Sequence, residues 1–260
     1  MLSDISHDLR TPITSIRGFV EALKDGVVKD EDEKARTLDI IQEESERLSR
    51  LVDDLFYLAR LEGGEAPVEM AEVDLVALVR GAVEAMSPIS RDKGLTVTLD
   101  VDEDSTAKGV FRALGSADRL TRAILNILDN AIKFSPQGGS VKVALRLTEA
   151  ADAGNHEPQT DSKGENAVGV AGVTETKIPS PQLQAIISIS DQGPGISEED
   201  LARIFERFYR ADKARTRTKS GAGLGLSIAR FIVEQHKGRM WVDTALGQGS
   251  TFHIALPLLS

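Results

Sequence analysis

Residues 2–23 read LSDISHDLRTPITSIRGFVEAL and carry apolar side chains at a helical spacing. The apolar positions recur every three or four residues, at Leu2, Ile5, Leu9, Ile13, Ile16, Val20 and Leu23. That period places them on one face of an amphipathic helix, whereas a half-buried strand would alternate every second residue. This stretch therefore predicts a helix that packs in a bundle.

The same pattern returns after a short break. Residues 25–30 (DGVVKD) interrupt it, and apolar residues then recur at helical spacing from Leu38 to Ala59, before a Gly63-Gly64 stop. The extra apolar residues that widen this stripe are Ile40, Leu51, Phe56, Leu58 and Leu61. Because two helices alone can cover only part of such a stripe, we expect the hairpin to form a homodimeric four-helix bundle.

A second type of pattern follows, in which helical and alternating segments are interleaved. Strands are expected at residues 95–101, 141–147, 185–190, 240–244 and 251–256, and helices from Leu75 onward, over 118–134 and over 224–236. The predicted fold class is thus an all-α hairpin followed by an α+β domain. We place the hairpin at residues 1–64, a linker at 65–73 and the second domain at 74–260. Residues 149–184 are poor in large apolar groups, so we expect a disordered insertion loop there.

Composition limits the classes of function. The 260 residues include 31 basic and 41 acidic side chains, a formal net charge of −10, so we expect no nucleic-acid partner. The chain has no cysteine, which excludes disulfides, thiolate nucleophiles and zinc–thiolate or iron–sulfur sites. It shows neither a signal peptide nor a run of about 18 apolar residues, so we expect a soluble, cytoplasmic chain without a membrane span.

Four short motifs carry polar groups suited to phosphate chemistry. His7, followed by Asp8 and then by Thr11 one turn later, offers a neutral imidazole at cytoplasmic pH, whose ring nitrogen can attack a phosphoryl group. Asn126, Asn130 and Lys133 fall on one face of the helix expected over 118–134. Amide oxygens suit Mg²⁺ and an ammonium suits a triphosphate, so Asn130 is the candidate metal ligand.

The other two motifs are rich in glycine. Asp191 ends an apolar strand before Gly193 and Gly195, where a buried carboxylate can accept a hydrogen bond from an adenine amino group. Residues 221–227 (GAGLGLS) precede a helix and so place unpaired backbone N–H groups where a phosphate can bind. Taken singly, each motif is also compatible with a surface histidine, a solvent-facing asparagine, an ordinary turn or a solvated loop.

Together the motifs resemble a known family. Residues 6–12 (SHDLRTP) resemble the phosphoacceptor box of the sensor histidine kinases of two-component systems, and residues 126–134, 191–195, 204–210, 221–227 and 247–252 resemble their N, F and glycine boxes in family order. The resemblance implies an α+β sandwich of the Bergerat ATP-binding type, with ATP and Mg²⁺ as cofactors and the receiver domain of a response regulator as partner. The implied nucleotide-binding residues are Asn126, Asn130, Lys133, Phe134, Asp191, Gly193, Gly195, Tyr209, Arg210, Gly221, Gly223, Leu224 and Gly225.

The resemblance also implies roles and alternatives. His7 would be phosphorylated, Asp8 would raise its basicity, and Thr11 would orient water for dephosphorylating the regulator. Related chaperone and gyrase ATPases carry a glutamate base where this chain has Asn126, and an amide cannot take a proton from water. An ATP-driven clamp of that class and a non-catalytic dimeric scaffold remain as alternatives. Such kinases normally continue upstream into a signal-relay or membrane segment, so we expect the full-length protein to be anchored at the inner membrane.

Overall fold

The computed structural model describes residues 2–63, 69–102, 106, 109–149, 183–210 and 223–259; the side chains of residues 2–8, 47, 58 and 60–63 are not included in that description. Its elements, in chain order, are α1 (Leu2–Lys24), α2 (Glu31–Gly63), β1 (Ala71–Asp74), α3 (Leu75–Asp92), β2 (Thr96–Val101), β3 (Arg112–Gly115), α5 (Ala117–Phe134), β4 (Ser140–Glu149), β5 (Leu183–Ser190), α6 (Glu198–Leu201), α7 (Gly225–Gln235), β6 (Arg239–Thr244) and β7 (Ser250–Pro257).

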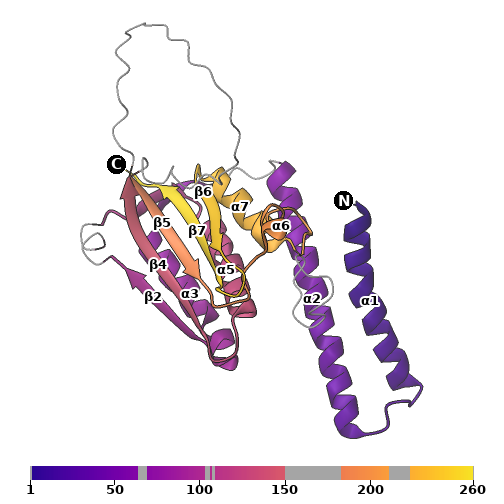
Figure 1. The fold of residues 1–260 in the computed structure, drawn as a ribbon. Coiled ribbons are helices and arrows are strands. Elements are labelled where there is room, and N and C mark those ends of the chain that lie inside the picture. The colour runs from indigo at the N-terminus through magenta and orange to yellow at the C-terminus, as the bar shows by residue number, and fades with distance from the viewer. Residues whose placement is uncertain are drawn as a thin grey trace, which may run out of the picture.

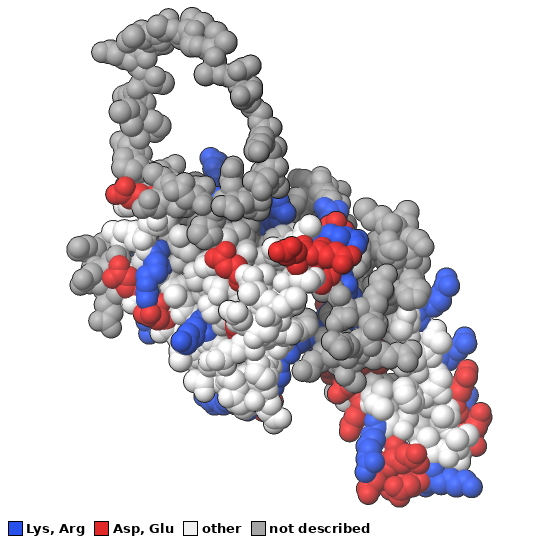
Figure 2. All heavy atoms as spheres, in the orientation of Figure 1, with Lys and Arg blue, Asp and Glu red and all other residues white. Residues whose placement is uncertain are grey.

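Helices α1 and α2 form the expected hairpin (Figure 1). The first turn of α2 contains Glu31, Asp32 and Glu33, whose charges complement the positive end of the helix. Acidic and basic side chains gather at this tip of the hairpin (Figure 2). Leu51 is buried, whereas several large apolar side chains of the hairpin stay exposed, among them Ile13 (51%), Leu38 (57%) and Phe56 (64%).

The remaining elements form an α+β domain around a mixed sheet. Its strand order is β2-β4-β5-β7-β6, in which only the β2–β4 pair is parallel. Side chains of β4 and β5 alternate between buried and more exposed, so one face of the sheet is apolar. Helices α3 and α5 lie behind the sheet in Figure 1, and the core contains fully buried residues of α5, such as Ile127 and Leu128, together with Val143 of β4 and Ile187 of β5. The fold class expected from the sequence is confirmed.

A two-stranded antiparallel sheet was not predicted. Strand β1 pairs with β3 and lies partly within residues 65–73, where we expected only a linker. Each strand has four residues, and β3 buries only Ala113 and Gly115, which are too small to produce a hydrophobic pattern. Asp74 ends β1 and caps α3, because its Oδ1 accepts hydrogen bonds from Val76 N at 2.9 Å and Ala77 N at 3.1 Å.

Two sequence expectations concern regions that the structure does not describe or describes only in part. Glu149 ends β4, and Leu183 and Gln184 begin β5, so the expectation of a disordered loop over 149–184 is wrong for these three residues. The rest of that range, residues 150–182, lies outside the described residues. Among the helices that the structure does describe, none is both long enough and apolar enough to span a bilayer.

Candidate functional site

Helix α1 carries the first motif. Its backbone includes His7 and Asp8, whose side chains are not described, so their arrangement stays a prediction. Thr11 lies one turn further along α1 and is exposed. Pro12 sits inside the helix, where the missing N–H leaves the Asp8 carbonyl without its usual helical partner.

Helix α5 presents the second motif on its polar side. Asn126 Nδ2 donates a hydrogen bond to Gly225 O at 3.1 Å, which ties α5 to the first residue of α7. Asn130 follows one turn later; its side chain is half-buried and makes no hydrogen bond within the described part of the chain. Lys133 is half-buried, while Phe134 at the end of the helix is 48% exposed. The hydrogen bond therefore places Asn126 beside the start of α7, whereas the metal-binding role of Asn130 stays a prediction.

Asp191 follows β5 in a turn held by backbone amides. Its Oδ1 accepts hydrogen bonds from Gly193 N at 2.7 Å and from Ser250 N at 3.3 Å. Burial raises the pKa of this carboxyl group, and the two amides partly oppose the shift by stabilising the anion. A small cavity of about 240 Å³ opens beside Asp191 and is lined otherwise by residues 243–245 and 248–251.

Glycines allow close backbone approach around this carboxylate. A Cβ atom on Gly193 would lie 2.8 Å from Asp191 Oδ1 and 3.2 Å from Phe134 O, so the turn packs directly on the end of α5. Gly195 has a φ of +72°, and a Cβ there would lie 2.0 Å from Ala245 O. Only glycine fits such positions without moving the backbone.

The glycine-rich loop before α7 is described from Gly223 onward, so Gly221 lies outside the described residues. Gly223 has a φ of +70° and its carbonyl accepts a hydrogen bond from Phe208 N at 2.9 Å. Leu224 is fully buried and Gly225 begins α7. The loop thus leads into a helix N-terminus, the arrangement that suits phosphate.

Two further predicted residues lie just before residue 211. The Tyr209 hydroxyl donates to Asp200 Oδ1 at 2.6 Å, and the Arg203 guanidinium lies 4.1 Å from the Tyr209 ring centroid. The hydrogen bond to Asp200 raises the pKa of Tyr209. Hydrogen bonds from the Ser197 hydroxyl and, second, from Tyr209 lower the pKa of Asp200. Arg210, half-buried, is the next residue. Tyr209 therefore ties this segment to α6.

Sequence reasoning missed residues that organise the site through the backbone. Thr244 Oγ1 accepts from Ile196 N at 3.0 Å and donates to Gly249 O at 3.0 Å, which joins the Asp191 turn to the glycine box before β7. A threonine at a strand end beside Gly247 and Gly249 is the only sequence signal of this role.

A contact between α2 and α5 joins the hairpin to the second domain. Arg122 Nη2 lies 2.6 Å from Asp54 Oδ1, and its guanidinium carbon lies 3.9 Å from the Tyr57 ring centroid. Both charged side chains are partly buried, at 32% and 23% exposure. Arg122 precedes Asn126 by one helical turn, so α2 packs beside the helix that bears the asparagines.

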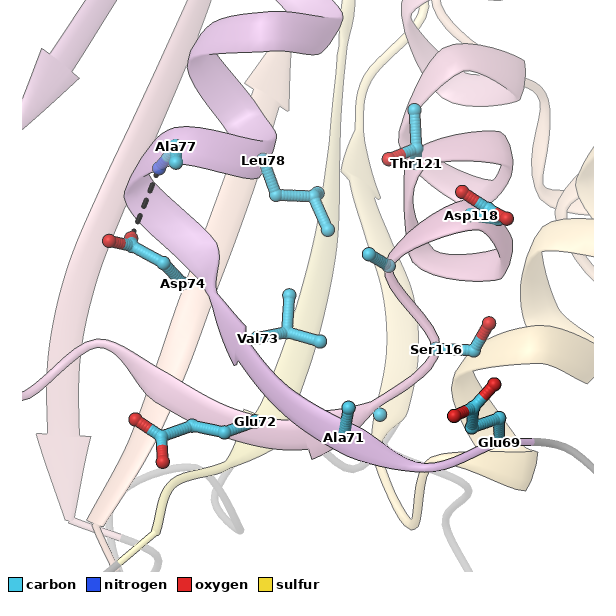
Figure 3. A pocket seen from close by; sticks show the side chains of 12 residues that line it. Glu69, Ala71, Glu72, Val73, Asp74, Ala77, Leu78, Ser116, Asp118 and Thr121 are labelled. Carbon is cyan, nitrogen blue, oxygen red and sulfur yellow. Dashed lines mark hydrogen bonds between the residues drawn. The ribbon is translucent and has the colours of Figure 1, made fainter.

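A second cavity lies elsewhere, between β1, the start of α3 and the start of α5 (Figure 3). It measures about 490 Å³ and includes Glu69, Glu72, Asp74 and Asp118 in its lining. Carboxylates would repel a triphosphate, so this cavity is not the candidate phosphate site.

Comparisons with known proteins agree with the motifs. A family model described as "Histidine kinase-, DNA gyrase B-, and HSP90-like ATPase" matches residues 115–260, and one described as "His Kinase A (phospho-acceptor) domain" matches residues 1–64. Sensor histidine kinase WalK of Bacillus subtilis (strain 168) is 29% identical over 98% of this chain and 36% of its own. Sensor protein SrrB of Staphylococcus aureus (strain NCTC 8325 / PS 47) is 32% identical over 98% of this chain and 37% of its own. The chain thus spans little more than a third of these relatives.

Solved structures share the arrangement of elements. Acinetobacter baumannii histidine kinase AdeS has a TM-score of 0.64 at 24% identity, covering 98% of both chains. Full-length ShkA, solved in complex with AMPPNP, has a TM-score of 0.61 at 26% identity, covering this whole chain and 46% of that one. Histidine kinase ThkA, solved in complex with the response regulator protein TrrA, has a TM-score of 0.68 at 22% identity, covering this whole chain and 61% of that one.

Proposed function

Because the chain belongs to the sensor histidine kinases of two-component systems, we propose that it phosphorylates His7 with ATP and passes the phosphoryl group to an aspartate of a response regulator. One observation carries the proposal. Asn126 on α5 is bonded to the glycine-rich start of α7, and the end of α5 packs on the Asp191 turn, so three motifs meet at one site in a chain that also bears a phosphoacceptor hairpin.

The residues at this site fit Mg·ATP. Asp191 offers a half-buried acceptor for the adenine amino group, beside a cavity, and Asn130 offers an amide oxygen that no described residue engages. Lys133, Arg210 and the glycine-rich loop supply cations and N–H groups for the phosphates. Bound Mg²⁺ would neutralise charge that develops on the β- and γ-phosphate oxygens. Tyr209, which is tied to Asp200, would support this pocket rather than enter it.

The chemistry consists of two phosphoryl transfers. A ring nitrogen of His7 attacks the γ-phosphorus of ATP; a P–N bond forms, the bond to the β–γ bridging oxygen breaks, and ADP leaves. A regulator aspartate oxygen then takes the phosphoryl group and the P–N bond breaks. Asp8 would raise the basicity of the imidazole. Thr11, exposed on α1, would orient water that dephosphorylates the regulator, which makes the protein a phosphatase as well.

Asn126 favours a kinase over an ATP-hydrolysing clamp. Its side-chain N–H group already donates to Gly225 O, and its amide oxygen is too weakly basic to accept a proton from water. We infer that bound ATP is hydrolysed slowly and awaits a histidine.

The exposed apolar residues of the hairpin support a dimer. Ile13, Val20, Leu38 and Phe56 are each at least 38% exposed, although they belong to the apolar stripes of α1 and α2. A second hairpin would bury them in a four-helix bundle. We place the hairpin domain at residues 1–64 and start the catalytic domain at β1, since β1 pairs with β3.

The test is autophosphorylation with γ-labelled ATP and Mg²⁺. Wild-type protein and His156→Gln, a matched histidine control, should gain label that resists alkali and is lost in acid, while His7→Gln should gain none. Label retained on His7→Gln would refute the assigned acceptor. Nucleotide binding without label in any variant would favour the non-catalytic scaffold.

The metal ligand is tested by binding alone. Asn130→Ala should abolish Mg²⁺-dependent ATP binding, and Asp129→Ala, an exposed neighbour on α5, should leave it unchanged. Equal affinity in both variants would remove Asn130 from the metal site.

A further inference from the structure

Lys93 caps the C-terminal end of α5 from another element. It is the residue that follows α3, and it is half-buried. Its Nζ donates hydrogen bonds to Lys133 O at 2.8 Å and to Ser135 O at 2.7 Å, and also to Ile132 O. An ammonium group has three N–H donors, so a single side chain serves three backbone carbonyls.

These carbonyls need such a partner. The last four carbonyls of a helix have no intrahelical donor, and the C-terminal end of the helix is electronegative. Lysine is commonly found near helix ends for this reason, but usually on the helix itself. Lys93 lies 40 residues from Lys133 in sequence. It reaches α5 because the start of β2 lies beside the residues that follow α5, where Thr96 N donates to Gly139 O at 3.1 Å.

The capped end of α5 is also a wall of the nucleotide site. Ser135, whose carbonyl Lys93 binds, is fully buried, and its Oγ accepts a hydrogen bond from Gln192 N at 3.5 Å. Gln192 Oε1 accepts from Ser140 N at 2.8 Å. Gly193 packs against Phe134 O. The end of α5 and the Asp191 turn thus form one packed unit, with Lys93 at its base.

We propose that Lys93 is a positioning residue for nucleotide binding. Its ammonium fixes the last turn of α5. Through Ser135 and Gln192, it also sets the distance between Lys133, which is assigned to the phosphates, and the Asp191 carboxylate, which is assigned to adenine. This inference rests on the proposed function of the site.

The test compares variants of Lys93 in the full chain. Lys93→Met keeps the length of the side chain but removes its charge and donors, whereas Lys93→Arg keeps both. We expect Lys93→Met to raise the KM for ATP about tenfold with kcat within about twofold, because ground-state and transition-state binding weaken together. Lys93→Arg keeps the charge but presents its donors in a planar fork, so it should raise the KM less than Lys93→Met does. Lys142→Met, on an exposed position of β4, should change neither.

A second control separates positioning from stability. Leu99→Ala removes part of a side chain of β2 that packs against the core, away from the site, so it should lower the free energy of unfolding without raising the KM. If Leu99→Ala raised the KM for ATP as much as Lys93→Met does, the effect would come from lost stability and the proposal would be overturned. The proposal would also be overturned if Lys93→Met and Lys93→Gln both failed to fold. It would equally be overturned if Lys93→Met folded and its KM for ATP were unchanged.

Measuring Mg·ADP binding by calorimetry distinguishes a failure of the proposed function from a failure of the role proposed for Lys93. Wild-type protein that binds no nucleotide would refute the proposed function itself. Wild-type protein that binds nucleotide, alongside a folded Lys93→Met that binds it equally well, would refute only the role of Lys93.

Discussion

Gly249 lies against the backbone of Asp191, and replacing it with alanine should damage both stability and nucleotide binding. Its φ is +85°, and a Cβ there would lie 2.1 Å from Asp191 O and 3.2 Å from Gln192 Cα. Gly247, two residues earlier, has a φ of +78° but nothing within 4 Å of its Cβ position. Alanine at Gly247 would therefore meet only backbone strain, whereas alanine at Gly249 would meet backbone strain and a steric clash.

The two costs can be estimated. A left-handed conformation costs alanine about 1–2 kcal/mol, partly offset by about 0.4–1 kcal/mol from reduced freedom of the unfolded chain, so Gly247→Ala should lose about 1 kcal/mol. At Gly249 the Asp191 carbonyl must also retreat by 1.3 Å, the difference between 2.1 Å and ordinary contact at 3.4 Å. Such backbone displacement adds about 1–3 kcal/mol. It also strains the hydrogen bonds between Asp191 and Ser250, at 2.8 and 3.3 Å.

Urea unfolding and equilibrium binding of a fluorescent ATP analogue measure both effects. Gly249→Ala should lose about 2–4 kcal/mol and at least about tenfold in nucleotide affinity, whereas Gly247→Ala should bind within about twofold of wild type. Equal affinities in the two variants would refute the claim that the Gly249 approach positions Asp191.

Three further predictions concern other residues. A double-mutant cycle with Asp54→Ala and Arg122→Ala should give a coupling free energy of about 0.5–2 kcal/mol, and a value near zero would mean that α2 and α5 do not pair through these side chains in solution. Burial lowers the pKa of His236, whose Nε2 accepts a hydrogen bond from Ser116 N at 2.9 Å, so the unfolded chain takes up the proton more readily. The free energy of unfolding should therefore fall as the pH drops below about 6.5, and His236→Gln should flatten that fall in urea titrations at several pH values. Thr11→Ala should autophosphorylate normally but dephosphorylate the regulator more slowly, which loss of label from a phosphorylated receiver domain would measure.

Much of the fold was predictable because its signals are local. The apolar residues of α1, α2 and α5 repeat at helical spacing, and those of β4 and β5 alternate, so element type followed from period. The β1–β3 pair escaped prediction, since its stability comes from pairing between distant segments and from small residues such as Ala113.

The residues of the candidate site likewise include some that a local motif predicts and some that only distant contacts reveal. Asn126, Asn130 and Asp191 stand in recognisable motifs, so they were predicted together before any geometry was known. Lys93 bonds to Lys133 O and Thr244 bonds to Ile196 N, and such contacts between residues far apart in sequence leave no local pattern. Tyr209 was expected to bind nucleotide, and its hydrogen bond to Asp200 depends on how the chain after α6 folds back onto that helix.

The antiparallel register of β4 and β5 bears on how this catalytic domain can evolve and be engineered. Glu149 faces Leu183, so the chain between them leaves and re-enters the sheet at neighbouring strand ends. The entropy of closing a flexible loop grows slowly with length, by about 0.6 kcal/mol for each doubling, so a flexible segment inserted between these two strand ends would cost the fold little. A reporter or ligand-binding domain could therefore be inserted between β4 and β5. Ligand binding to the inserted domain could then affect β5, the strand that leads into Asp191.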